Sequence, residues 1–444
     1  MRVLHVPFQF TSGELGGTEI YVAALCKWLT SLGVESAIAA PANSSGFDIV
    51  DKVPIHYFGT DPKAGFDQAY GRPDAVAATN FRYVLAAWRP EIVHLHARSA
   101  AVSELLVEEA RLAGCRIVYT YHTPTASCAR GTMMHMGNEP CDGVLDITRC
   151  TSCVLQKYGV SAAPRFLLAR TPIPFGKLLA RTGREGGIWT ALRLRTLIAE
   201  GHSRFYQLMN GVDKVVGVCN WVAQVMRSNG VLEPKLFVSR QGLPNAPTQL
   251  TAASPVALDH RYVRRASAPF KIRYFGRIDQ TKGLDLLARA LSFIPHSNVT
   301  LEIYGIRQGE MSAFSKHLDA LLALDPRIVM KSPLAAEQVV AAMRECDLVA
   351  VPSQWLETGP LVVLEAFAAG TPVIGSRLGG ITELVRNGVD GILVEARDAC
   401  AWARAIADIE ADHSSLQAFR DSIRPPRTTK HVADEMHSLY RELI

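Results

Sequence analysis

The sequence lacks an apolar run of 18 residues free of charges and helix breakers, so we expect no membrane-spanning helix. Its first residues, Met1 to Phe8, lack the basic stretch and long apolar core of a secretory signal peptide. It also lacks a strong charge of one sign. The 47 Lys and Arg exceed the 42 Asp and Glu too little to predict a nucleic-acid partner. We therefore expect a cytoplasmic protein, in solution or peripheral on the inner face of the cell membrane.

The composition is that of a folded protein, because 48% of the 444 residues are hydrophobic and 20% are charged. Short apolar strands alternate with amphipathic helices in the first half of the chain and again from residue 271. Such alternation predicts parallel sheets covered on both faces. We expect two doubly wound, Rossmann-like α/β domains facing a cleft. The predicted segments are 1–250 with an insert at 123–210, then 251–424, and a helix at 425–444 that crosses back to the first domain.

The strongest motif runs from Glu357 through Glu365 to the glycine at 370. Pro360 suits the first position of a short, apolar and therefore buried helix, and Gly370 suits its end. The N-terminus of such a helix presents free N–H groups to an anion such as a diphosphate. Glu357 lies before the helix and Glu365 lies more than one turn inside it, so we expect the carboxylates to bind different hydroxyls along one ligand.

A second motif, Phe275 to Gly283, follows a predicted strand and opens a helix. Its two cations, Arg277 and Lys282, flank the turn and could stabilise a departing diphosphate without a metal ion. A third segment is the glycine loop 13–19, which contains Gly16 and Gly17. It is either a tight turn or a place where the backbone approaches a phosphate or a sugar.

Together with Thr120-Tyr-His122-Thr, these motifs resemble a retaining glycosyltransferase of the GT-B fold, in family four (glycosyl transferases group 1). The resemblance covers nearly the whole chain and indicates a polysaccharide-biosynthesis type with a four-cysteine insert. It implies a nucleotide diphosphate sugar as donor, bound mainly by the second domain. It also implies transfer with retained anomeric configuration, and a catalytic centre that needs no metal.

The resemblance assigns roles to individual residues. Arg277 and Lys282 would neutralise the diphosphate, and Glu365 would hold the ribose hydroxyls. Glu357 would hold the donor sugar, helped by the backbone near Gly359, Pro360 and Leu361. In the first domain, His122 would face the sugar, and Gly16 and Gly17 would lie near the diphosphate and the acceptor. The implied catalytic residues are His122, Glu357, Arg277 and Lys282. The segment from Gln241 to Asn245 departs from the family's pattern and receives no role.

Four cysteines cluster as Cys128-x12-Cys141-x8-Cys150-x2-Cys153, which a minimal member of this family does not need. In a reducing compartment such a cluster is more often a metal site than a pair of disulfides. Four thiolates suit a structural zinc ion or an iron–sulfur cluster, and free thiols are the alternative.

Residues 157–204 are strongly basic, with nine Lys and Arg against two Glu. This segment carries +7 whereas the whole chain carries +5, so the remainder sums to −2. The segment is either a solvated helical face or a surface attracted to anionic lipid, which would suit a lipid-linked acceptor.

We therefore expect a glycosyltransferase that moves a hexose to a glycan or lipid-linked acceptor. One alternative is another GT-B enzyme, such as a sugar-nucleotide epimerase or a soluble sugar synthase. Another is a non-catalytic protein that binds a nucleotide sugar or senses redox state through its cysteines.

Overall fold

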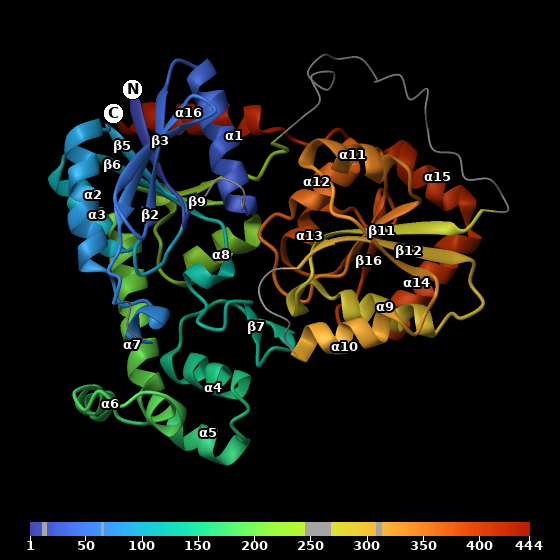
Figure 1. Cartoon of the computed structure of the whole chain (residues 1–444), viewed down its shortest axis with the longest axis horizontal. Helices are drawn as coiled ribbons and strands as arrows, with labels where there is room; N and C mark the ends of the chain where they lie inside the picture. Colours follow the sequence, from blue (N-terminus) through green and yellow to red (C-terminus); the bar gives the residue numbers. More distant parts are fainter. Residues whose placement is uncertain (11–15, 64–65, 245–267, 308–312) are drawn as a thin grey trace. The chain divides into compact units, whose positions relative to one another are not determined.

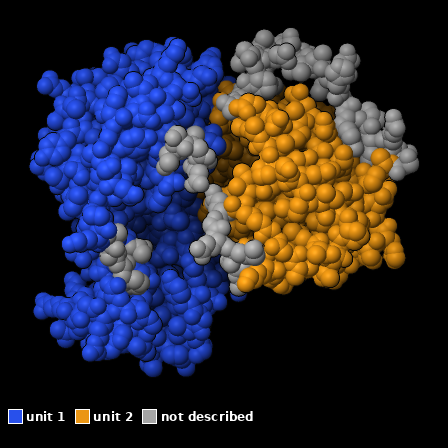
Figure 2. Space-filling view, in the orientation of Figure 1, with its two compact units in different colours: residues 1–240, 429–444 blue, residues 241–428 orange. Residues whose placement is uncertain are grey.

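The computed structural model describes residues 1–10, 16–63, 66–244, 268–307 and 313–444. The chain forms two compact units (Figure 1, Figure 2). Unit 1 comprises Met1–Arg240 and Thr429–Ile444, and unit 2 comprises Gln241–Thr428. The domain boundary expected at 250/251 falls among residues 245–267, outside the described residues.

Unit 1 contains an eight-stranded sheet in the order β10-β9-β6-β5-β1-β2-β4-β3 (Figure 1). Every neighbouring pair is parallel except β3 and β4, which pair antiparallel. The strands are β1 (Arg2–Val6), β2 (Glu35–Ala42), β3 (Gly46–Val50), β4 (Val53–Gly59), β5 (Ile92–Leu95), β6 (Arg116–Tyr121), β9 (Lys214–Gly217) and β10 (Leu236–Val238).

Helices of unit 1 cover this sheet, and one of them comes from the far end of the chain. They are α1 (Gly17–Ser31), α2 (Ala75–Trp88), α3 (Glu104–Leu112), α8 (Asn220–Ser228) and α16 (Thr429–Leu443). Tyr21 and Leu25 of α1 share a core cluster with Met436 and Tyr440 of α16. The segment 429–444 therefore completes the hydrophobic core of unit 1, although unit 2 precedes it in the sequence.

A helical insert lies between β6 and β9. It contains the small hairpin β7 (Met134–His135) and β8 (Glu139–Pro140), and the helices α4 (Ile147–Lys157), α5 (Ala162–Leu168), α6 (Ile173–Ala180) and α7 (Gly187–Gly211). The insert has a small core of its own, with Val154 and Leu155 of α4 against Leu194 and Ile198 of α7. Figure 1 shows α5 and α6 at the end of α7 that lies away from the sheet.

Unit 2 contains a six-stranded, fully parallel sheet in the order β13-β12-β11-β14-β15-β16. Its strands are β11 (Phe270–Arg277), β12 (Val299–Ile306), β13 (Ile328–Lys331), β14 (Leu348–Val351), β15 (Val373–Ser376) and β16 (Gly391–Val394). Its helices are α9 (Leu284–Ser292), α10 (Ala313–Leu322), α11 (Ala336–Arg344), α12 (Leu361–Ala368), α13 (Gly379–Leu384), α14 (Ala399–Ala411) and α15 (His413–Ser422).

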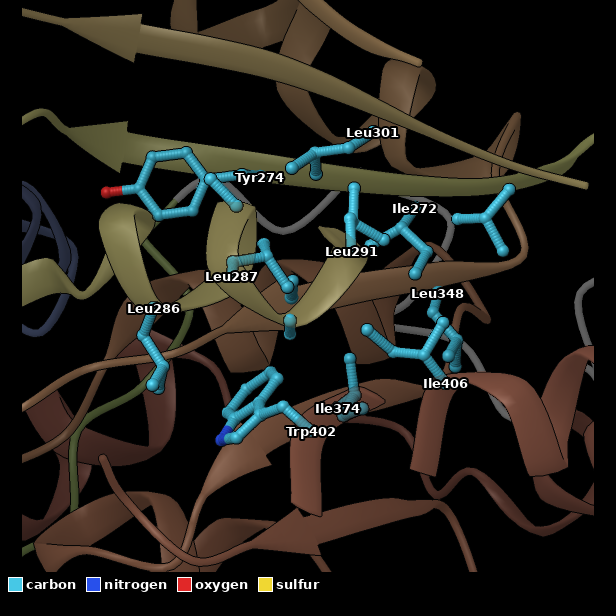
Figure 3. Close-up of a cluster of buried hydrophobic side chains, with 14 of the residues drawn as sticks. Ile272, Tyr274, Leu286, Leu287, Leu291, Leu301, Leu348, Ile374, Trp402 and Ile406 are labelled. Atoms are coloured by element: carbon cyan, nitrogen blue, oxygen red, sulfur yellow. The ribbon is translucent and has the colours of Figure 1, made fainter. Parts of the chain in front are cut away.

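The main core of unit 2 lies between its sheet and the helices α9 and α14. Figure 3 shows Leu287 and Leu291 of α9 gathered with Ile272 of β11 and with Trp402 and Ile406 of α14. All five side chains are buried completely, so they fix how the helices lie against the strands. The predicted α/β class, with a parallel sheet in each half, is confirmed.

Candidate functional site

Three of the predicted site residues lie in or beside two loops of unit 2. β11 and β14 are parallel neighbours, so their carboxyl ends lie at the same edge of the sheet. Arg277 is the last residue of β11, the loop that follows contains Lys282, and the loop after β14 contains Glu357. A backbone hydrogen bond fastens the loops together, because the N–H of Gln354 donates to the carbonyl of Thr281 at 2.7 Å.

Gly283 allows these loops to approach closely. Its backbone is left-handed, with φ of +70°, and a Cβ atom at this position would lie 2.0 Å from the carbonyl oxygen of Pro352. No L-residue with a side chain fits that space, and glycine alone adopts this φ without strain. Helix α9 can therefore begin directly against the loop that carries Glu357.

Lys282 and Glu357 form a largely buried ion pair. The Nζ of Lys282 donates to Oε1 of Glu357 at 2.6 Å, and the Oγ of Ser353 donates to the same oxygen at 2.8 Å. The exposed fractions of the Lys282 and Glu357 side chains are 21% and 9%. The ammonium group of Lys282 also lies 5.4 Å from the centre of the Trp355 ring. The ammonium group of Lys282 is thus fixed against the loop that follows β14.

The ionisation of Glu357 follows from these contacts. Burial by itself raises the pKa of this carboxyl, but the charge of Lys282 and the hydrogen bonds from Lys282 and Ser353 outweigh it. The pKa of Glu357 therefore lies below its ordinary value. Glu357 is a carboxylate at neutral pH and accepts hydrogen bonds.

Glu365 lies on α12 in a different environment. Its carboxylate makes no hydrogen bond or ion pair with any residue that the structure describes, and its side chain is partly buried. Burial raises the pKa of Glu365 above its ordinary value. A carboxylate kept away from water without a protein partner is costly, and a ligand that donates hydrogen bonds to it would remove that cost.

Arg277 occupies the last position of β11, where its side chain is about half exposed. One guanidinium nitrogen lies 3.6 Å from the carboxylate of Asp279. The hydroxyl of Tyr274 donates to the carbonyl of Arg277 at 2.5 Å and so anchors the backbone of the turn. Arg277 thus combines a fixed backbone with an accessible cationic group.

A third loop, which was not predicted from the sequence, joins this junction. Gly379 and Gly380 begin α13 after β15, and the N–H of Gly380 donates to the carbonyl of Glu357 at 2.6 Å. A Cβ atom on Gly379 would lie 2.7 Å from the same oxygen. The available signal was the glycine pair itself, which follows β15 and opens a helix as Gly283 opens α9 after β11.

The start of α12 differs slightly from the prediction. Pro360 is the residue that precedes the first helical position, which is Leu361. Gly359 packs closely on a residue to which the sequence analysis gave no role, since a Cβ atom there would lie 3.3 Å from the Gln241 side chain. Asn245, in the same departing segment, lies outside the described residues.

In unit 1, Gly16 and Gly17 stand at the beginning of α1. The carboxylate of Glu19 turns back to the backbone N–H of Gly16, so a Cβ atom on Gly16 would lie 2.7 Å from Glu19. At Gly17, a Cβ atom would meet no atom of the described residues within 4 Å. The first helical turn thus leaves space beside Gly17. Residues 13–15 of the predicted loop lie outside the described part of the chain.

His122 follows β6 directly and is 5% exposed. It belongs to a chain of three imidazole rings. Nε2 of His122 lies 3.1 Å from Nδ1 of His96, and Nε2 of His96 lies 3.0 Å from Nδ1 of His5. The ring of Tyr21 contacts the ring of His122 edge-on, with centres 4.7 Å apart. The position and orientation of His122 are therefore fixed from two sides.

These histidines are neutral. Burial lowers the pKa of His5 and of His122 to about 3, and it lowers the pKa of His94 and His96 well below the ordinary value, with neighbouring imidazoles adding to the effect. His94 lies between two hydroxyls, that of Tyr440 at 2.6 Å and that of Thr120 at 2.7 Å. The four imidazoles can donate and accept hydrogen bonds, but they carry no charge at neutral pH.

His5, His94 and His96 were not predicted as site residues from the sequence. The signal was His94-x-His96 in one strand, with His5 and His122 at the ends of two others. These three strands, β1, β5 and β6, are consecutive in the sheet. His5, His94 and His96 form the group of possible metal ligands found among the described residues, with ligand atoms within 4.8 Å of one another.

The four cysteines of the insert do not form such a group within the described residues. A tetrahedral zinc site would bring the sulfur atoms to about 3.8 Å from one another. All four are free thiols, and Cys153 accepts a hydrogen bond from the N–H of Met136 at 3.2 Å. Burial raises the pKa of Cys150 to about 12 and also raises the pKa of Cys141. Burial thus favours the neutral thiol at Cys141 and Cys150.

Comparison with known families addresses both halves of the chain. Residues 15–165 match the family described as Glycosyltransferase Family 4, and residues 259–424 match Glycosyl transferases group 1. The chain combines these two glycosyltransferase domains in a GT-B fold. The second domain contains Lys282, Glu357 and Glu365, and the first contains Gly16, Gly17 and His122.

Similar proteins agree with these domain assignments. The chain is 30% identical over 213 residues to a D-inositol 3-phosphate glycosyltransferase of Corynebacterium glutamicum (strain R). The match covers 45% of this chain, and the chain spans about half (51%) of that relative's length.

Solved structures match over the full length of the chain. Sucrose-phosphate synthase from Thermosynechococcus elongatus superposes with a TM-score of 0.67 at 18% identity, covering 100% of this chain and 98% of that one. The Anabaena protein HepE, crystallised in complex with UDP, gives a TM-score of 0.64 at 16% identity and covers 100% of both chains. At these identities the likeness establishes the GT-B fold of the glycosyltransferase domains.

Proposed function

We propose that the chain is a glycosyltransferase that moves a hexose from a nucleotide diphosphate sugar to a hydroxyl group of a glycan or lipid-linked acceptor, with retention of the anomeric configuration. The observation that carries this proposal is the loop junction of unit 2. The buried Lys282–Glu357 pair lies at this junction, and the same unit holds the unpartnered carboxylate of Glu365 on α12. A cation for phosphate oxygens and carboxylates for sugar hydroxyls are what a nucleotide sugar requires.

Each charged group suits one part of the donor. The free carboxylate of Glu365 accepts hydrogen bonds from the ribose hydroxyls. Glu357, together with the backbone at the start of α12 (Gly359, Pro360, Leu361), holds the hydroxyls of the donor sugar. Arg277 at the end of the neighbouring strand β11 and Lys282 in the loop that follows it bind the diphosphate.

The reaction then needs no ionised acid or base from the chain. The bond between the anomeric carbon and the diphosphate oxygen breaks, and the acceptor oxygen bonds to the same face of that carbon. The proton of the acceptor hydroxyl passes to the departing phosphate oxygen. The positive charges of Arg277 and Lys282 stabilise the negative charge that develops on the diphosphate, so we propose that the catalytic centre works without a metal ion.

Unit 1 supplies neutral groups in this proposal. Burial keeps the pKa of His122 at about 3, so its imidazole acts through hydrogen bonding to the donor sugar rather than through charge. The space beside Gly17 and the turn at Gly16 suit the approach of the acceptor and the diphosphate. We place the activity in polysaccharide biosynthesis, in the cytoplasm or at the inner face of the cell membrane.

The test is calorimetric titration with a panel of nucleoside diphosphate sugars, followed by assay of transfer. Losing one hydrogen bond to a charged group costs about 1.5–3 kcal/mol, so Glu365→Gln should weaken donor binding about 10- to 150-fold. Glu337→Gln, which removes an exposed carboxylate from α11 of the same unit, is the matched control and should bind like the wild type.

The products distinguish the alternatives. Transfer to an acceptor supports the proposal. Tight donor binding without turnover would instead identify a nucleotide-sugar-binding protein. A nucleotide sugar with an inverted stereocentre would identify an epimerase. If Glu365→Gln binds the donor as tightly as the control Glu337→Gln and the wild type do, the assignment of Glu365 is wrong.

A further inference from the structure

The end of the helical insert exposes an unusual amount of apolar surface. The α5–α6 arm, residues 157–188, contains α5 and α6 and lies at the end of α7 away from the sheet (Figure 1). Helix α5 buries no side chain at all. Large apolar side chains of the arm are between 42% and 70% exposed: Tyr158, Phe166, Leu167, Phe175, Leu178 and Ile188. Large apolar side chains left exposed this densely along one segment indicate an interaction surface.

This surface is held in place from behind. Gly176 is the buried residue of α6, and a Cβ atom there would lie 2.1 Å from Oγ1 of Thr196 on α7. The backbone of α6 therefore lies directly against α7. The residues on either side of Gly176, such as Phe175 and Leu178, are consequently turned toward solvent.

The arm is also positively charged. It contains six basic residues and one acidic residue, Glu185, and none of the six forms an ion pair with a carboxylate of the described residues. The six are Lys157, Arg165, Arg170, Lys177, Arg181 and Arg184. Two of them lie over aromatic rings instead: Arg170 is 3.7 Å from the centre of Phe166 and Arg184 is 4.7 Å from that of Trp189.

The other cations of the basic segment are used inside unit 1. Arg193 is buried and donates to Asp67 at 2.6 Å, and Arg204 lies 3.4 Å from Glu200. Arg195 donates to the carbonyl of Thr171. The charge of residues 157–204 therefore divides into an internal set on α7 and a solvent-facing set on the arm.

We propose that the α5–α6 arm is the surface by which this protein binds an anionic lipid bilayer. Its aromatic and leucine side chains would enter the boundary between headgroups and acyl chains, while the cations, which have no carboxylate partner among the described residues, meet lipid phosphates. Charge argues against a second copy of the chain as the occupant, because two such arms would place like charges against each other. No helix among the described residues is long and apolar enough to cross a membrane. Contact would therefore be peripheral.

Vesicle co-sedimentation of the full chain tests this directly. Vesicles of phosphatidylcholine, with and without phosphatidylglycerol, are compared at equal total lipid. The wild type should bind the anionic vesicles, release them as salt is raised, and leave the neutral vesicles unbound. Each cation lost from the surface should weaken partitioning about fivefold. The charge reversal Lys177→Glu with Arg181→Glu should therefore weaken it at least 25-fold.

A second variant separates apolar insertion from charge. Phe166→Ser with Leu167→Ser alters α5, which buries no side chain, and should also abolish sedimentation. The matched control is Phe47→Ser with Ile49→Ser, since these side chains are equally exposed at 60% but lie on β3. The control should bind like the wild type.

Three outcomes would overturn the proposal: equal binding to neutral and anionic vesicles, wild-type binding by both arm variants, or loss of binding in the β3 control. Self-association that both arm variants abolish would assign the surface to a second copy. Transfer to a water-soluble acceptor should be unchanged in the arm variants. Failure of lipid binding is thereby distinguishable from failure of the proposed glycosyl transfer.

Discussion

Replacing Lys282 with methionine removes the cation from the buried pair and leaves the carboxylate of Glu357 behind. That carboxylate is 9% exposed, so its charge is then largely without compensation. Breaking a buried ion pair in this way costs about 3–5 kcal/mol. In a domain of the size of unit 2, each kcal/mol lowers Tm by about 2–4 °C, so Tm should fall by roughly 6–20 °C.

The two partners are not equivalent. Lys282 is more exposed than Glu357, so the ammonium group left by Glu357→Gln reaches water more easily than the carboxylate left by Lys282→Met. We therefore expect Glu357→Gln to cost less stability. The double variant leaves no buried charge and should recover part of the loss. All three variants should lose donor binding.

The pH dependence gives this prediction a sign. In the wild type the pKa of Glu357 is below its ordinary value, so the pair stabilises the fold above the pKa of the unfolded chain, and this contribution is lost as pH falls through the folded pKa. In Lys282→Met, burial dominates and raises the pKa of Glu357. The stability deficit of the variant should therefore shrink as pH falls and the carboxyl takes up a proton.

Differential scanning calorimetry of the four proteins across pH measures these quantities. A deficit for Lys282→Met that does not change with pH would refute the assignment of the cost to the Glu357 charge. A larger loss in Glu357→Gln than in Lys282→Met would refute the argument from burial.

Two further predictions follow from the structure, and a third follows from the spacing of the insert cysteines in the sequence. Gly283→Ala should destabilise unit 2 by several kcal/mol in urea unfolding, because the new Cβ would clash with the backbone and φ is left-handed. Gly370→Ala is the control, since its φ is also left-handed but its surroundings are open, and it should cost only about 1 kcal/mol. Equal costs for the two variants would show that the clash at Gly283 is absent. Because the pKa of His122 is about 3, the rate of transfer should show no inflection near pH 6.5, and an inflection there that His122→Asn removes would show that this imidazole titrates. We propose that the insert cysteines hold a structural zinc ion or an iron–sulfur cluster. Metal analysis of freshly purified anaerobic protein should then find bound metal that Cys150→Ser removes. Wild-type protein without bound metal would rule the site out.

Local pattern predicted the elements and the class of the fold well. The apolar run before Gly276 and the spacing of Leu284, Leu287 and Leu291 correspond to β11 and α9. The β3–β4 hairpin was not predicted, since its exposed residues alternate only weakly.

Contacts between residues far apart along the chain could not be predicted from the sequence. Lys282 and Glu357 are 75 positions apart, and their pairing depends on β11 and β14 being neighbours, an order that no local motif encodes. The histidine chain likewise depends on the order of β1, β5 and β6. The basic residues of 157–204 can be counted from the sequence, but the buried ones cannot be told from the exposed ones. Arg193 is buried and Arg181 is exposed, although both are arginines.

The packing of α16 has a consequence for how the chain is made. Val432, Met436 and Tyr440 fill the core beside α1, and the Tyr440 hydroxyl reaches His94. A nascent chain therefore emerges from the ribosome with this groove of unit 1 open, and it stays open while all of unit 2 is synthesised. Unit 2 is a single contiguous segment, so its core needs no residue that is synthesised after Thr428. Unit 2 is translated second, but it can therefore be the first unit to finish folding.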